Sequence, residues 1–139
     1  MSMMGIFNVS SSAASAQSQR LNVVASNLAN VDTVAGPDGA AYKARQVVFQ
    51  TQLLGANPTD PTSAGVRVST VREDDTPGRR VHDPKHPSAD ADGYVTYSNV
   101  NAVEEMVNMI SASRSYQNNL EVMNTAKTLL LKTLQLGQG

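Results

Sequence analysis

Apolar residues recur with helical spacing near the start of the chain. Residues 10–31 contain neither Gly nor Pro, and apolar side chains fall on one narrow seam at seven-residue intervals. The seam positions are Ala14, Leu21 and Leu28, with Val24 and Val31 between them. This pattern predicts an amphipathic helix over residues 10–31.

The first half of this helix has weak helical propensity. Residues 10–19 are almost entirely Ser, Ala and Gln, and Ser favours caps and turns over helix interiors. We expect this half to be disordered in a free monomer. Residues 1–33 are therefore predicted to form an N-terminal helix with a disordered leading segment.

A longer helix is predicted over residues 103–136, again without Gly or Pro. At 1.5 Å per residue it would span about 50 Å. Asn101 is placed to cap its start with Glu104 three residues later, Glu105 suits the positive helix end, and Gly137 ends the pattern. Residues 101–139 are predicted to form this C-terminal helical region.

Spacings of three and four along the second helix are typical of a coiled-coil seam, interrupted by a Ser and a Lys. The positions are Met106, Met109, Ser113, Tyr116, Leu120, Met123, Lys127, Leu130 and Leu134.

Between the helices, residues 34–100 are rich in turn-forming residues. Short β-branched runs at residues 46–53, 66–72 and 94–97 are separated by Pro and Gly, a pattern that predicts strands joined by turns into one small antiparallel sheet. The fold class is thus mainly α with a small β insert: long N- and C-terminal helices forming a coiled-coil-like pair, with short antiparallel strands between them.

The long seam is too extensive for the insert to cover. Only 4% of the residues are aromatic, so the large side chains that usually fill a monomeric core are scarce. We therefore expect another copy or a sister protein to cover part of the seam.

Charge and composition exclude several classes of partner. The formal net charge of -1 predicts no nucleic-acid or anionic-membrane binding. The chain has no Cys, which excludes disulfides and thiolate metal sites. We expect no membrane insertion and no cleaved signal peptide, because the sequence has no apolar run of the required length.

Candidate catalytic and metal sites are weak. The residues at 90–93 begin like a calcium loop but lack the later acidic ligands, so a polar turn is the better interpretation. Pro84 lies among His82, Asp83 and His86, and Pro87 follows them, which favours a solvated loop over a metal site. No nucleophile elbow or phosphate-binding loop is present, and we expect no enzyme activity, no cofactor and no metal.

Two segments carry a family resemblance. Asn27, Asn30, Thr33, Tyr42 and Lys43 match the N-terminal signature of bacterial flagellar rod and hook proteins, in which two Asn flank Leu-Ala before a Thr, an aromatic and a basic residue.

The opposite end of the chain resembles the other signature of the same family, over residues 103–116. Most members place Gly-Tyr directly after the Thr, whereas residues 34–41 intervene here. This longer linker, with the motifs at residues 82–84 and 92–95, is similar to the proximal-rod type of the family.

The resemblance implies a non-enzymatic structural subunit of the proximal rod of the flagellar basal body, a hollow torque-transmitting shaft in the periplasm. It implies export by the flagellar type III apparatus. The implied partners are copies of the chain, other rod proteins, the adaptor between the MS ring and the rod, and the export apparatus.

The predicted subunit-interface residues are Ala14, Leu21, Val24, Asn27, Leu28, Asn30, Val31, Met106, Met109, Ile110, Tyr116, Leu120, Met123, Leu130 and Leu134.

Two alternatives remain open at this stage. Asn27 and Asn30 are either ordinary residues at a helix end or buried asparagines that fix register across a subunit contact. On the second interpretation, Asn27→Ala weakens assembly more than monomer folding. The whole chain, likewise, could instead be a small monomeric module that binds ligands through its β insert.

Overall fold

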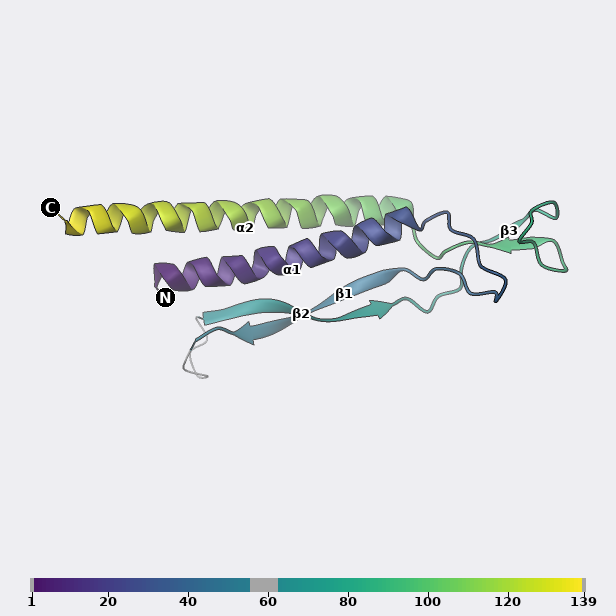
Figure 1. Cartoon of the computed structure of the whole chain (residues 1–139), viewed down its shortest axis with the longest axis horizontal. Helices are drawn as coiled ribbons and strands as arrows, with labels where there is room; N and C mark the ends of the chain where they lie inside the picture. The colour runs from purple at the N-terminus through teal and green to yellow at the C-terminus, as the bar shows by residue number, and fades with distance from the viewer. Residues whose placement is uncertain (1, 56–62, 139) are drawn as a thin grey trace.

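The computed structural model describes residues 2–55 and 63–138 of the chain. Its elements are α1 (Met3–Ala29), β1 (Arg45–Leu53), β2 (Ala64–Glu73), β3 (Arg80–His82), β4 (Tyr94–Thr96) and α2 (Ala102–Gly137). The two helices lie side by side and run in opposite directions, and the β1–β2 hairpin lies along another side of α1 (Figure 1). The predicted fold class is confirmed.

The first helix begins earlier than the predicted residue 10. It starts at Met3, where the Oγ of Ser2 accepts a hydrogen bond from the backbone N–H of Gly5 at 3.0 Å. Gly5 lies in the first helical turn, close to this cap, and does not end the helix. The disorder predicted for this segment in a free monomer stays a prediction.

The second helix agrees closely with the sequence pattern. The Oδ1 of Asn101 accepts hydrogen bonds from the backbone N–H groups of Val103 and Glu104, at 3.1 and 3.2 Å. This confirms the predicted N-cap. The helix continues through Gly137, one residue beyond the predicted end.

The insert forms two separate two-stranded sheets, where the sequence pattern predicted one. β1 and β2 pair antiparallel from Arg45 opposite Glu73 to Leu53 opposite Ala64, with an irregularity between Val48 and Phe49. β4 pairs instead with β3, a three-residue strand that was not predicted. Residues 56–62 of the predicted insert lie outside the described residues.

Small residues dominate the interior of the helix pair. Ala16 and Ala112 are 1% and 0% exposed, and Ala14, Val24 and Ala126 are also buried. Because α1 contacts α2 and both strands of the β1–β2 hairpin, it is the central element of the body. The packing therefore depends on close approach of the backbones more than on large side chains.

The seam of α2 is rotated relative to the predicted one. Met109, Tyr116, Met123 and Leu130 are half-buried, as the pattern predicted. At three positions between them the buried residue lies one place earlier than predicted: Glu105, Ala112 and Ala126 are buried, whereas Met106 and Lys127 are exposed and Ser113 is half-buried. Asn119 and Leu120 are both half-buried. This shift explains the apparent interruptions, since Ser113 and Lys127 do not occupy the centre of the contact.

Candidate subunit interface

Asn27 is completely buried and joins three elements of one chain. Its Oδ1 accepts from the backbone N–H of Arg45 at 2.9 Å, and its Nδ2 donates to the carbonyl of Arg45 at 2.8 Å. The same Nδ2 donates to the Oε2 of Glu105 at 3.0 Å. The amide thus connects the last turns of α1 to the first residue of β1 and the first turn of α2.

A fourth hydrogen bond completes the capacity of this amide. The hydroxyl of Tyr42 donates to the Oδ1 of Asn27 at 3.0 Å. Burial is the largest cause that raises the pKa of Tyr42, so the phenol keeps its proton at neutral pH and remains a donor. An Asn side chain offers two donors and two acceptor lone pairs, and all four are used here within the chain.

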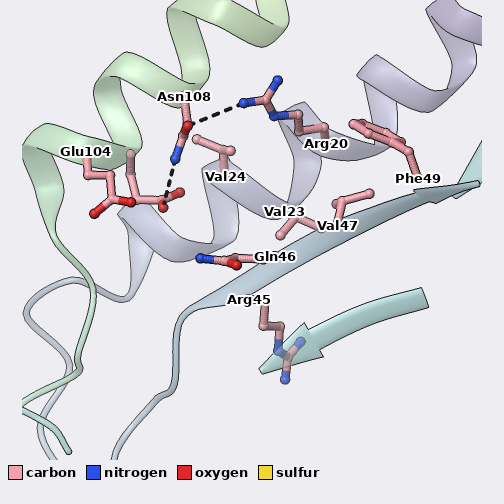
Figure 2. Close-up of a pocket in the computed structure, with 10 residues that line it drawn as sticks. Arg20, Val23, Val24, Arg45, Gln46, Val47, Phe49, Glu104 and Asn108 are labelled. Atoms are coloured by element: carbon pink, nitrogen blue, oxygen red, sulfur yellow. Dashed lines mark hydrogen bonds between the residues drawn. The ribbon is translucent and has the colours of Figure 1, made fainter. Parts of the chain in front are cut away.

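The polar cluster continues from Glu105 along the helix contact. The Nδ2 of Asn108 donates to the Oε1 of Glu105 at 3.4 Å, and the Nη2 of Arg20 donates to the Oδ1 of Asn108 at 3.3 Å. Figure 2 shows Arg20 and Asn108 on facing helices beside a groove that Val47 and Phe49 border from β1. Asn108 thereby links the buried carboxylate of Glu105 to a cation.

Asn30 has a local role. Its Nδ2 donates to the carbonyl of Ser26 at 2.8 Å, its Oδ1 accepts from the hydroxyl of Thr33 at 3.1 Å, and it caps the C-terminus of α1. This matches the interpretation of Asn30 as a helix-end residue. For both asparagines the structure gives partners within the chain, and a role across a subunit contact stays a prediction.

The predicted interface residues fall into three classes of exposure. The buried residues are Ala14, Val24 and Asn27; the half-buried ones are Leu21, Leu28, Asn30, Val31, Met109, Tyr116, Leu120, Met123 and Leu130; the exposed ones are Met106, Ile110 and Leu134. The buried class is already enclosed by α2 or the β1–β2 hairpin. Only the residues of the exposed class leave more than half of their surface accessible.

Two further exposed apolar residues complete a continuous patch on α2. Val103 and Val107 are 72% and 61% exposed, and Met106 and Ile110 are 55% and 56% exposed. We call these four residues the outer α2 patch. Their spacing of three and four residues places them on one face of the helix, and the sequence interpretation missed the two valines because they lie off the predicted seam.

A second apolar region lies at the C-terminal end of α2. The C-terminus of α2 extends past the N-terminus of α1 (Figure 1). Leu131, Leu134 and Leu136 are 51%, 56% and 84% exposed there. Next to them, Met3, Ile6, Val122 and Leu129 line a shallow groove between the two helices.

The residues considered for metal binding have other contacts. The ring of His82 packs edge-on against Tyr94 at 4.9 Å, and the Nδ1 of His86 accepts from the backbone N–H of Ser88. In the ranges 2–55 and 63–138, no three His, Asp or Glu residues cluster as a metal site would require.

The predicted polar turn before β4 is confirmed. The Oδ1 of Asp90 accepts from the backbone N–H groups of Asp92 and Tyr94, at 3.0 and 2.9 Å. Among the described helices, none combines the length and apolar character needed to cross a bilayer.

Comparison with known proteins matches both ends of the chain to flagellar rod families. Residues 7–37 match the family "Flagella basal body rod protein", and residues 91–136 match "Flagellar basal body rod FlgEFG protein C-terminal". These segments contain α1 from Phe7 onward and nearly all of α2.

Similar proteins cover the chain from end to end. "Flagellar basal-body rod protein FlgC" of Yersinia enterocolitica is 58% identical over 138 residues, 99% of this chain and 100% of that protein. The proteins of the same name from Salmonella typhimurium and Escherichia coli O6:H1 are 55% and 56% identical with the same coverage. These relatives are named as rod proteins, which confirms the predicted non-enzymatic class and the resemblance to rod proteins. The chain belongs to the FlgC family of flagellar basal-body rod proteins.

Proposed function

We propose that this chain is a structural subunit of the basal-body rod that assembles with copies of itself and with other rod proteins through its terminal helices. The outer α2 patch carries this proposal. Four neighbouring apolar side chains, each more than half exposed, lie on one face of a helix in a chain with few large buried side chains. Covering such a patch with another subunit removes apolar surface from water.

The exposed leucines at the C-terminal end of α2 support the same proposal. The outer α2 patch and these leucines lie at opposite ends of a 36-residue helix, so two different surfaces of one subunit are available for neighbours. Contacts between unlike surfaces generate an open helical assembly when the rotation between neighbours does not close a ring. A hollow shaft is an assembly of this kind.

The specific partners and the export route are part of the same proposal. We propose that the subunit passes unfolded through the flagellar type III export apparatus, without a cleaved signal peptide, and assembles in the periplasm next to the adaptor between the MS ring and the rod. The Ser-rich first half of α1 fits this route, because a segment with low helical propensity costs little free energy to keep unfolded.

A single charged substitution tests the role of the patch. Val107→Glu places a carboxylate on an exposed position, so the variant is expected to fold with the wild-type circular dichroism spectrum. In cells that lack their own copy of the subunit, it is expected to fail to complete the rod. Gln117→Glu, also exposed on α2, is the matched control and is expected to support rod assembly.

Wild-type rod completion by Val107→Glu would contradict the proposal. Export is scored separately with a deletion of residues 1–19, which removes the weak half of α1. This deletion is expected to impair rod completion, and comparing secreted protein with completed rods separates a defect in transport from one in assembly.

A further inference from the structure

The outer hairpin, formed by β3, β4 and the loop between them at residues 83–93, projects away from the rest of the molecule. Figure 1 shows it beyond the ends of the helices. Among the described elements, β3 and β4 make extensive contacts only with each other. Its direction relative to the helices therefore depends on the chain connections that lead to it.

Three connections meet where the outer hairpin joins the body: residues 30–44 between α1 and β1, residues 74–79 between β2 and β3, and residues 97–101 between β4 and α2. Asn99 lies in the last of these connections, two residues before the N-cap Asn101. It is half-buried at this junction.

The side chain of Asn99 bonds to both of the other connections. Its Oδ1 accepts from the backbone N–H of Ala44 at 2.6 Å. Its Nδ2 donates to the carbonyls of Asp74 and Thr76, at 2.8 and 3.0 Å, and lies 3.1 Å from the Thr76 hydroxyl. A single amide therefore joins the entry to β1, the exit from β2 and the entry to α2.

The acceptors are held in place by a local turn. The backbone N–H of Thr76 donates to the Oδ1 of Asp74 at 3.0 Å. The backbone N–H of Asp74 donates to the carbonyl of Ala44 at 2.8 Å. Asn99 thus binds to groups that are already fixed at the end of the β1–β2 hairpin.

A different residue attaches the junction to the connection that follows α1. The hydroxyl of Ser98 donates to the carbonyl of Val31 at 2.7 Å, and the backbone N–H of Ser98 donates to the carbonyl of Thr33 at 3.2 Å. Loss of the Asn99 side chain would leave this attachment intact and release the attachment to the β1–β2 hairpin. The outer hairpin would then pivot about its bonds to the connection that follows α1, without unfolding of the body.

From this geometry we propose that Asn99 is a positioning residue that fixes the direction of the outer hairpin relative to the helix pair. Within the rod it sets where the outer hairpin meets its neighbours, a consequence that rests on the proposed function. The positioning itself is a property of the folded single chain. If Asn99 does not position the outer hairpin, the proposed rod function still stands. If the chain does not form the rod, Asn99 still positions the outer hairpin in the single subunit.

The absence of Cys allows direct measurement of this direction with spin labels. Labels at Ala91→Cys, in the outer loop, and Ser111→Cys, on α2, report the direction of the hairpin in the full chain. A second pair at Thr70→Cys and Ser111→Cys reports the geometry of the body. All three positions are exposed.

In this labelled chain, Asn99→Ala is expected to broaden and shift the distance distribution of the first pair while leaving that of the second pair unchanged. Asn119→Ala is the matched control, because Asn119 is half-buried and its Nδ2 donates within α2 to the carbonyl of Ser115. It is expected to change neither distribution. If Asn99 only stabilised the fold, Asn99→Ala would lower the unfolding midpoint without changing the distance distribution of the first pair.

Asn99→Asp provides a second variant in case Asn99→Ala does not fold. It keeps an acceptor for the Ala44 N–H and removes the donors to Asp74 and Thr76, so a broadened first-pair distribution is again expected. A wild-type distribution in Asn99→Asp, or in a folded Asn99→Ala, would overturn the proposal. Equal broadening in the Asn119→Ala control would overturn it as well.

Discussion

Asn27 and Glu105 are 78 positions apart in the sequence, yet the Nδ2 of Asn27 donates to the Oε2 of Glu105 at 3.0 Å in the interior of the fold. Both side chains are buried. The carboxylate oxygen is the acceptor, and Asn27 also holds both backbone polar groups of Arg45. The two ends of the chain are therefore fixed in register within one subunit, before any neighbour is involved.

The first prediction concerns this link. Asn27→Ala removes four hydrogen bonds and leaves buried groups of Arg45 and Glu105 without their partner, which is expected to lower the free energy of unfolding by about 3 kcal/mol. Urea denaturation measures the change. Asn22→Ala, an exposed position on the same helix, is the control and is expected to change stability by less than about 0.5 kcal/mol.

The same variant distinguishes the two interpretations of Asn27. A stability loss with a parallel loss of rod assembly would assign the residue to the fold of the single subunit. An assembly defect without a measurable change in stability would instead support the subunit contact predicted from the sequence.

The second prediction concerns the junction below the outer hairpin. A Cβ added at Gly78 would lie 2.1 Å from the backbone carbonyl oxygen of Tyr97. Because this neighbour is backbone, it has little freedom to move away, and Gly78→Ala is expected to lower stability by about 1–3 kcal/mol. Thermal unfolding followed by circular dichroism measures the loss.

Gly137→Ala serves as the comparison for Gly78→Ala. A Cβ at Gly137 has no atom within 4 Å, and the residue lies at the end of α2, so this variant is expected to be neutral or slightly stabilising. If the two substitutions changed stability equally, the clash with the Tyr97 carbonyl would not be the cause of the stability loss in Gly78→Ala.

The helices could be predicted from the sequence because their signals are local. The absence of Gly and Pro, the apolar spacing and the Asn101 cap all depend on residues near one another, and α2 was predicted to within two residues. The detailed helix contact was not predictable in the same way. Counting large apolar side chains placed Met106 on the seam. The buried residues of the helix contact include Ala112 and Ala126 instead, whose small side chains allow the two helices to approach closely.

The junction residues escaped prediction because their partners are distant in sequence. Asn99 bonds to Ala44, which is 55 positions away, and nothing in its immediate surroundings distinguishes it from other turn asparagines. β3 was missed for the same reason: three residues have no strand periodicity of their own, and β3 forms only through its pairing with β4. Val103 and Val107 of the outer α2 patch could have been found by searching for helical apolar spacing outside the main seam.

The third prediction concerns acid. The backbone N–H of Tyr94, assisted by that of Asp92 and by the Arg80 guanidinium, holds the pKa of Asp90 below its ordinary value of 3.8. The folded-state pKa is thus lower than the unfolded one, so this contribution to stability is present above 3.8 and is lost as the pH falls through the lower folded value. The turn before β4 is expected to loosen only in that acidic range.

The chemical shift of the Tyr94 amide proton, followed by NMR through an acid titration, reports this transition. Asp90→Asn keeps an acceptor oxygen but has no charge to titrate. In this variant the acid-dependent shift is expected to disappear. A titration of the Tyr94 amide with an unshifted midpoint in the wild-type chain would contradict the assignment of the hydrogen bonds.

The last prediction concerns the isolated subunit. The helices α1 and α2 contain 27 and 36 of the 139 residues, close to half of the chain. Because the first half of α1 is rich in Ser and the C-terminal end of α2 extends past α1, both ends are expected to fray in a free monomer. Circular dichroism of the monomer at about micromolar concentration should then report less helix than the structure contains.

Raising helix propensity on the exposed face of α1 tests the cause. Ser11, Ser15 and Ser18 are all exposed, and replacing the three with Ala favours the helix by a few tenths of a kcal/mol at each position without changing the packed face. The triple variant is expected to gain helix relative to the wild-type monomer. Full helicity in the wild-type monomer, or no gain of helix in the triple variant, would mean that the pairing of α1 with α2 alone holds these residues in the helix. The proposed link between a weak N-terminal segment and export would then lose its physical basis.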